Sequence, residues 1–332
     1  MLNTLVDAPA DAPVCAPVMT AAPAAAPPFR LRAAELKALA LRSNGPATRQ
    51  TLVHLGAIAV TAALLWQALG TLWALPLTVL LGYLQAFLFT ALHECAHQTA
   101  FRSRAGNTLL GHLSGLALLL PYEYYRAFHW DHHRYTQDAE RDPELSTPLP
   151  ARGWPLLWYF SGLPTWRDRI HLRLVHGALG RVTAPWVAAD KRPLIVREAR
   201  CYLAFYALVA TVSVATHSMA AVWLWIVPMM VGQVFLRPYL LAEHTGCGHS
   251  RDMLENTRTT FTNAVVRRFA WNMPYHAEHH AYPAVPFHAL PGLHALLADH
   301  IVHTAPSYRA ATATVMRSLA DRSAKAAPGA TA

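Results

Sequence analysis

Four long apolar segments limit what this chain can fold into more than any other feature. They run over about residues 52–69, 72–92, 200–216 and 221–241. Each is close to the roughly 20 residues that a helix needs to cross a bilayer. The breaks between them at 70–71 and 217–220 are short, so we expect two helical hairpins. Only 14% of the residues are charged, against about 25% in a typical soluble domain, which also favours a membrane protein.

The basic residues predict how these hairpins are oriented. All 28 Lys and Arg residues lie outside the two hairpin tips. The positive-inside rule therefore places both termini and both long polar segments in the cytoplasm, and we expect an inner-membrane location. Because the basic residues flank apolar spans and do not fill a soluble domain, no nucleic-acid partner is expected. The spans themselves are expected to hold no charge that could bind a polar substrate deep in the membrane.

The remaining segments complete the predicted domain organisation. Residues 1–29 are rich in Ala and Pro and are expected to be disordered. Residues 30–50 hold five basic residues and predict a short helix on the membrane surface. The membrane domain then covers 51–305, and 306–332 form a C-terminal tail.

Nine histidines lie in three short boxes and one isolated position beside the spans. Box 1 is His93 and His97, box 2 is His129, His132 and His133, box 3 is His276, His279 and His280, and the isolated residue is His244. Spacings of three and four residues put the imidazoles of one box on one helix face. Neutral imidazole is the commonest metal ligand, and nine exceed the needs of one zinc ion. Iron joins such a ligand set to O2 chemistry, so we predict two irons.

Other residues near the boxes receive different predictions. Carboxylates beside the boxes are expected to orient imidazoles; the candidates are Glu94, Asp131, Glu243 and Glu278. The histidines that lack box spacing are not expected to be ligands; they are His249, His288, His294, His300 and His303.

The three boxes, their order and the two hairpins resemble the membrane fatty-acid desaturase and hydroxylase superfamily. The matching motifs are HECAH (93–97), HWDHH (129–133) and HAEHH (276–280), and the resemblance covers about residues 50–300. Bacterial fatty-acid desaturases are the most similar members. The resemblance implies an all-α integral membrane fold, with four transmembrane helices as two hairpins and a cytosolic helical cap. That cap would hold a histidine-rich, non-heme diiron site.

The resemblance also implies co-substrates and partners. They are O2, an acyl chain carried by lipid, CoA or a carrier protein, and an external electron donor. The chain has no cysteine pattern for an iron–sulfur cluster, so ferredoxin or a similar separate protein would supply electrons. His244 matches the lone histidine that completes the ligand set of the family. Animal acyl-CoA desaturases carry an asparagine four residues before it, where this chain has Leu240.

Several activities remain open at this point. Desaturation of an acyl chain is the first interpretation. The alternatives within the superfamily are a hydroxylase, an amino-acid-type desaturase and a decarboxylase that makes terminal alkenes. More remote ones are a metal transporter and an intramembrane zinc protease, because box 1 also spells H-E-x-x-H.

Overall fold

The computed structural model describes residues 29–150 and 153–326. The predicted disordered tail, residues 1–29, falls outside the described residues except for its last position. The chain divides into Met1–Arg30 and one large unit, Leu31–Ala332, and the fold given below is that of the large unit. Its described part is mostly helical, as predicted.

Four helical runs in the described part of the chain are long and apolar enough to cross a membrane, which confirms the predicted number. The first two are Asn44–Ala68 (α2) and Ala74–Ala96, which comprises α3 (Ala74–Ala86) and α4 (Leu88–Ala96). The third is Ala189–Ala215, a 3-10 turn (Ala189–Lys191) followed by α10 (Arg192–Ala215). The fourth is Val222–His244, which comprises a π-helical turn (Val222–Ile226), α11 (Val227–Val231) and α12 (Gln233–His244).

Each run extends several residues beyond the apolar segment seen in the sequence, always at the end nearer the histidines. A helix does not stop where its residues become polar, because its backbone hydrogen bonds continue. The second and fourth runs therefore carry box 1 and His244 on their last turns. The predicted surface helix over 30–50 is shorter than expected: α1 covers Ala33–Leu39, and α2 already begins at Asn44.

Two glycines let α3 and the α11–α12 run pack with their backbones in contact. A Cβ atom on Gly82 would lie 2.3 Å from the carbonyl oxygen of Pro228. A Cβ atom on Gly232 would lie 2.3 Å from the carbonyl oxygen of Gly82. Small residues at membrane helix crossings allow this close approach, and the crossing fixes the second run against the fourth.

Three charged side chains are buried within the membrane runs, Glu94, Glu198 and Arg237, and Arg237 also lies inside the fourth apolar segment seen in the sequence. The expectation of charge-free spans is therefore wrong. Arg237 is only 6% exposed. Its Nε donates to Gln233 Oε1 at 3.2 Å, and its Nη1 donates to Thr165 Oγ1 at 3.1 Å. These polar partners offset part of the cost of burying the guanidinium, and one of them comes from α8 (Leu163–Asp168).

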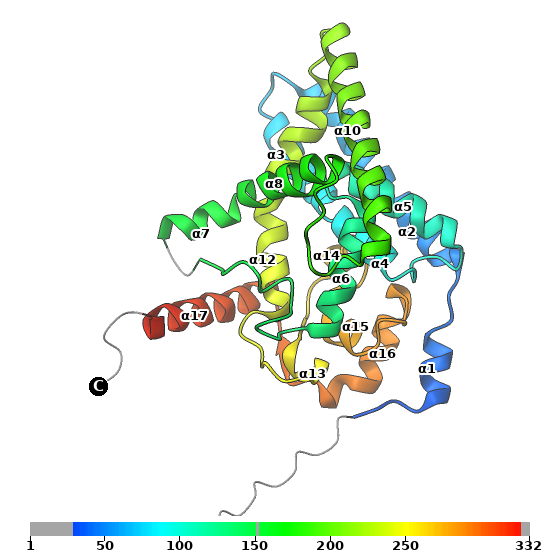
Figure 1. Cartoon of the computed structure of the whole chain (residues 1–332), viewed down its shortest axis with the longest axis vertical. Coiled ribbons are helices and arrows are strands. Elements are labelled where there is room, and N and C mark those ends of the chain that lie inside the picture. The colour runs from blue at the N-terminus through cyan, green and yellow to red at the C-terminus, as the bar shows by residue number, and fades with distance from the viewer. Residues whose placement is uncertain (1–28, 151–152, 327–332) are drawn as a thin grey trace, which may run out of the picture. The chain divides into compact units, whose positions relative to one another are not determined.

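The other helices are shorter, and they carry or cover the boxes. They are α5 (Arg104–Ala117), α6 (Tyr122–Tyr135), α7 (Gly153–Phe160), a π-helical turn (Arg169–Val175), α9 (His176–Ala178), α13 (Met253–Asn256), α14 (Ala264–Phe269), α15 (His276–Ala281), a 3-10 turn (Phe287–Ala289), α16 (Leu290–Leu297), a 3-10 turn (Ala298–His300) and α17 (Tyr308–Ala326). In Figure 1, α13, α15 and α16 gather at one end of the large unit, and α3 and α10 extend toward the other. Much of the predicted C-terminal tail is thus α17, which packs on α12 through the stacked rings of Tyr308 and Tyr239.

A short sheet is the one departure from an all-α fold among the described residues. Strands β1 (Arg258–Thr260) and β2 (His303–Ala305) pair in parallel. Each has three residues, too few for the alternating pattern that reveals a strand in a sequence. The Thr260 amide also donates to the carbonyl of Pro274 at 2.9 Å, so this sheet holds the segment that leads into box 3.

Candidate metal centre

Box 1 lies at the polar end of the second membrane run. His93 is on the last turn of α4, and His97 is the residue that ends this helix. The two residues are four apart, so both rings lie on one side of the helix. All nine residues of α4 are buried, and both imidazoles are 4% exposed. A fully buried helix therefore holds these two rings away from water.

Box 2 lies on α6, whose first turn is anchored by a carboxylate from another membrane run. The amides of Glu123 and Tyr124 donate to the two oxygens of Glu198, at 2.8 and 3.3 Å. A carboxylate at the N-terminus of a helix accepts hydrogen bonds from its free N–H groups and interacts favourably with the positive end of the helix dipole. Because Glu198 belongs to α10, the third membrane run sets the orientation of the helix that carries box 2.

Box 3 lies on the two-turn helix α15, after a tight reversal of the chain. Trp271 and Asn272 both have positive φ values, 52° and 57°. This left-handed conformation is uncommon for a bulky residue such as tryptophan and is tolerated by asparagine. The Trp271 indole is fully buried and donates to His54 Nδ1 at 3.2 Å. The buried Trp271 side chain therefore stabilises this chain reversal, which brings box 3 close to the other boxes.

The structure brings the nine predicted histidines together in two neighbouring groups. The first group is His93, His97, His129, His133 and His279, whose nearest ring nitrogens all lie within 4.8 Å of one another. The second is His132, His244 and His280, with the same spacing. His276 adjoins the second group, with its Nε2 3.2 Å from His244 Nε2. All nine side chains are buried, and each group could hold one metal ion.

The ring nitrogens point at one another in a way that suits a metal ion. His97 Nε2 lies 2.7 Å from His129 Nε2 and 3.1 Å from His279 Nε2. Two neutral imidazoles that face each other can share only one proton. Among the described residues, neither ring nitrogen of His93 has a hydrogen-bond partner, although the ring is buried. A bound cation would satisfy these lone pairs, so the donor set fits a nitrogen-ligated metal.

Outer contacts hold the rings of the second group in place. His132 Nδ1 lies 2.9 Å from Asp142 Oδ1. His280 Nδ1 lies 3.2 Å from Thr136 Oγ1, and His244 Nδ1 lies 3.3 Å from the carbonyl oxygen of Asn256. In His132 and His244 the Nδ1 atom is thus occupied, and Nε2 faces the group. Such partners fix both the tautomer and the ring orientation of metal-binding histidines.

Comparison with known proteins identifies the family. Residues 70–312 match the sequence profile described as fatty acid desaturase. This chain belongs to the fatty acid desaturase family. Family membership confirms the resemblance seen in the boxes.

Individual relatives of this family member differ in what their names say they act on. An sn-1 oleoyl-lipid 12-desaturase from Picosynechococcus is 35% identical over 103 residues, 29% of this chain and 28% of that protein. The dihydrorhizobitoxine desaturase of Bradyrhizobium elkanii is 29% identical over 233 residues, 65% of each chain. An sn-1 acyl-lipid omega-3 desaturase (ferredoxin) from Nostoc is 38% identical over 55 residues, 17% of this chain and 15% of that protein. The chain spans less than two thirds of the length of each of these three relatives.

Burial keeps most of the imidazoles of this desaturase-family centre neutral. Burial, followed by the charge of neighbouring imidazoles, holds the pKa of His129 well below its usual range. Burial and then the nearby His132 lower the pKa of His97 to about 3. For His132 burial also disfavours charge, but the carboxylates of Glu144 and Asp142 outweigh it and raise the pKa. Since neutral imidazole is the form that binds metal, the other rings need not lose a proton at neutral pH.

The structure corrects the predicted set of orienting carboxylates. Glu243 lies near a box, with its Oε1 3.5 Å from His276 Nδ1. Asp142, which contacts His132, was missed by the sequence reasoning. It lies ten residues after His132, in a turn that follows α6, and no helical spacing links the two.

The other three predicted carboxylates make their contacts away from the box imidazoles. Glu94 accepts a hydrogen bond from the Phe287 amide at 3.0 Å. Glu278 pairs with His294 and accepts from Thr259. Asp131 pairs with Arg134 at 3.3 Å near the surface. Glu94 and Glu278 thus tie the box helices to neighbouring segments.

The five histidines without box spacing belong to neither metal-binding group in the described part of the chain. His294 pairs with Glu278, and His249 Nδ1 lies 3.1 Å from the carbonyl of Gln137. His303 lies on β2, and His288 lines a separate cavity.

Proposed function

We propose that this chain is an O2-dependent membrane desaturase that introduces a C=C bond into an acyl chain at a diiron centre. The observation that carries the proposal is the pair of adjacent, buried, all-histidine groups in a member of the fatty acid desaturase family. Two neighbouring groups of nitrogen ligands suit two metal ions, and iron with this ligand set is commonly used for O2 chemistry.

The proposed ligands are the nine box histidines. His93, His97, His129, His133 and His279 would hold one iron, and His132, His244, His276 and His280 the other. When bound, the two irons supply the activation of O2 that removal of hydrogen from an unactivated C–H bond requires. The protein holds most of the imidazoles neutral, fixes rings of the second group through Asp142 and Thr136, and excludes water by burial.

We further propose that the four membrane runs form two hairpins in the inner membrane, with both termini and a helical cap in the cytoplasm. The connections 69–73 and 216–221 contain no Lys or Arg, which supports their placement on the outer side. Reporter fusions at Gly70 and Ser218 should report the outer side, and fusions at either terminus the cytoplasm. A cytoplasmic signal at Gly70 would refute the first hairpin.

The proposed substrate is an acyl chain on lipid, CoA or carrier protein, and the proposed electron donor is ferredoxin or a similar protein. Relatives named as acyl-lipid desaturases, one with ferredoxin in its name, support both. The test is expression in a bacterial host with a matching donor, followed by mass spectrometry of the lipids. We expect a new species lighter by two hydrogen atoms than its precursor.

Other products would identify the alternatives. A product heavier by one oxygen atom would make the chain a hydroxylase, and a terminal alkene lacking the carboxyl carbon would make it a decarboxylase. An amino-acid-type desaturase is the second candidate, because dihydrorhizobitoxine desaturase matches over the longest segment of the three relatives and Arg237 is buried in a membrane run. Unchanged lipids with an active donor present would favour it.

A zinc protease of the H-E-x-x-H type receives little support from the geometry. In a protease of the H-E-x-x-H type, the glutamate is the general base. Here the Glu94 carboxylate is engaged by the backbone of Phe287, and box 1 shares its group with three further histidines.

A further inference from the structure

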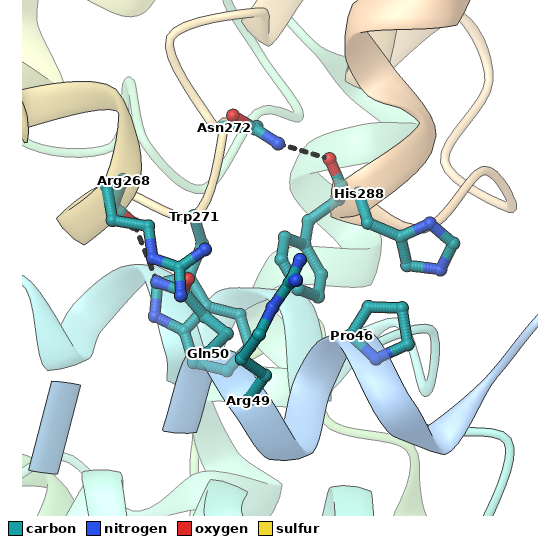
Figure 2. Close-up of a pocket in the computed structure, with 8 residues that line it drawn as sticks. Pro46, Arg49, Gln50, Arg268, Trp271, Asn272 and His288 are labelled. Carbon is teal, nitrogen blue, oxygen red and sulfur yellow. Dashed lines mark hydrogen bonds between the residues drawn. The ribbon is translucent and has the colours of Figure 1, made fainter. Parts of the chain in front are cut away.

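A cavity lies between the start of α2 and the segment that leads into box 3. Its volume is about 150 Å³, roughly ten times what a single water molecule needs. Figure 2 shows Arg49 reaching into it from α2 and Arg268 facing it from the end of α14. Gln50, Trp271, Asn272 and His288 complete its polar lining.

The lining of this cavity is rich in hydrogen-bond donors and contains no carboxylate. Arg49 and Arg268 each carry a guanidinium, and neither forms an ion pair within the described residues. Burial and then the charge of Arg49 lower the pKa of Arg268. Two like charges thus face one concave space with no anion from the protein between them. Such an arrangement favours a bound anion, because guanidinium groups recognise phosphate through paired hydrogen bonds.

The walls of the cavity are fixed by hydrogen bonds between separate segments. Gln50 Nε2 donates to the carbonyl of Arg268 at 2.6 Å, and Asn272 Nδ2 donates to the carbonyl of Phe287 at 3.0 Å. The left-handed backbone at Trp271 and Asn272 forms one wall. Left-handed residues other than glycine persist only where surrounding contacts hold them, and they cluster at binding sites. The cavity is therefore a preformed feature of the fold.

The position of the cavity connects the membrane boundary to the candidate metal centre. Arg49 lies in the second turn of the first membrane run, at its polar end. Toward the centre, Phe287 donates its amide to Glu94 of the HECAH motif, and Asn272 precedes His276 by four residues. A ligand held here would sit at headgroup level and beside segments that carry boxes 1 and 3.

We propose that Arg49 and Arg268 bind a phosphate group, and that this phosphate belongs to the polar carrier of the acyl substrate. The assignment to a carrier rests on the proposed desaturase function. A phospholipid headgroup and coenzyme A share this chemistry. The site would fix the polar end of the substrate. It would thereby determine which carbon atoms of the acyl chain lie next to the histidines.

Binding of phosphate probes to the full chain in detergent tests the site without any measurement of activity. The probes are inorganic phosphate, coenzyme A and dihexanoyl-phosphatidylglycerol, with uncharged dihexanoylglycerol as the control ligand. We expect a phosphate-bearing probe to bind, and Arg49→Gln and Arg268→Gln each to weaken it about tenfold or more, the effect of losing a charged hydrogen-bonding partner. Arg251→Gln, which removes an exposed arginine outside the cavity, should change the affinity less than twofold.

The outcomes separate the parts of the proposal. Tighter binding of phosphatidylglycerol supports a lipid carrier, and tighter binding of coenzyme A supports a thioester carrier. Binding of inorganic phosphate alone would support the phosphate site and overturn its role toward a carrier. No binding of any probe, or equal binding by Arg268→Gln with an unchanged melting temperature, would overturn the site. A chain that desaturates lipids without binding phosphate would refute this inference and leave the proposed function standing.

Discussion

The contact between Asp142 and His132 gives the sharpest test of the proposed metal centre. The Asp142 carboxylate is buried and accepts three N–H groups. Its Oδ1 lies 2.9 Å from both His132 Nδ1 and the Glu144 amide, and its Oδ2 lies 2.8 Å from the Gln137 amide. In Asp142→Asn the side-chain amide would present its own N–H groups either to Gln137 or to His132. At least one hydrogen bond must be lost, that of Gln137 in the first orientation and those of His132 and Glu144 in the second, and the negative charge that favours His132 disappears.

The expected loss follows from the role of such partners. Removal of an outer partner of a metal-binding histidine weakens metal affinity by roughly 10- to 100-fold, or about 1.4–2.8 kcal/mol at 1.4 kcal/mol per factor of ten. Because His132 belongs to the group with His244 and His280, we expect the iron of that group to be lost first. The assay is iron content after dialysis against chelators of increasing strength.

A control comes from the same turn. Asp138 accepts hydrogen bonds from the amides of Glu140 and Arg141 and contacts no box histidine. Asp138→Asn should therefore retain iron as the unmodified chain does. If Asp142→Asn keeps both irons with unchanged affinity, the carboxylate does not orient His132, and the reasoning from this contact is wrong.

Three further predictions concern ligands, packing and pH. Elemental analysis of the purified chain should find about two irons. His279→Ala should lower this iron content and abolish activity in a product assay. His303→Ala, outside both groups, should change neither the iron content nor the activity. Gly82→Ala should lower the thermal midpoint of unfolding, because its Cβ would lie 2.3 Å from a backbone atom and overpacking costs about 1–3 kcal/mol. Gly56 has open space around it, so Gly56→Ala should leave the thermal midpoint unchanged. The metal-free chain should lose stability as pH falls below about 6.5, because the unfolded chain then binds protons that His97, with a folded pKa of about 3, does not. The expected loss is on the order of 2 kcal/mol for such a histidine by pH 5, and a thermal midpoint that stays level or rises between pH 7 and pH 5 would contradict it.

The number of candidate membrane helices and the gathering of the box histidines were predictable because both depend on local pattern. An apolar segment of sufficient length predicts a span from composition alone, and histidines three and four residues apart share a helix side. The ends of the helices were not predictable, because polar residues continue them toward the histidines. The small sheet and α17 were missed for a similar reason: their pairing and packing partners are distant in the sequence.

The division of the histidines into two groups was also not predictable from box spacing. Spacings of three and four residues put each box on one helix side, but neighbouring residues on a helix point about 100° apart. His132 and His133 therefore face different groups, as do His279 and His280. Asp142 and Glu198 lie outside any box and act through tertiary contacts, so no spacing in the sequence identifies them.

The paired histidines at the ends of boxes 2 and 3 have a consequence for how the protein opens. Helices α6 and α15 each contribute to both groups, so with both ions bound neither helix can swing away without breaking bonds at both. Metal binding then joins four segments that are distant in the sequence into one cooperative unit. Amide hydrogen exchange in α4, α6, α15 and the end of α12 should accordingly slow together when metal is added, at one common rate set by a single opening event.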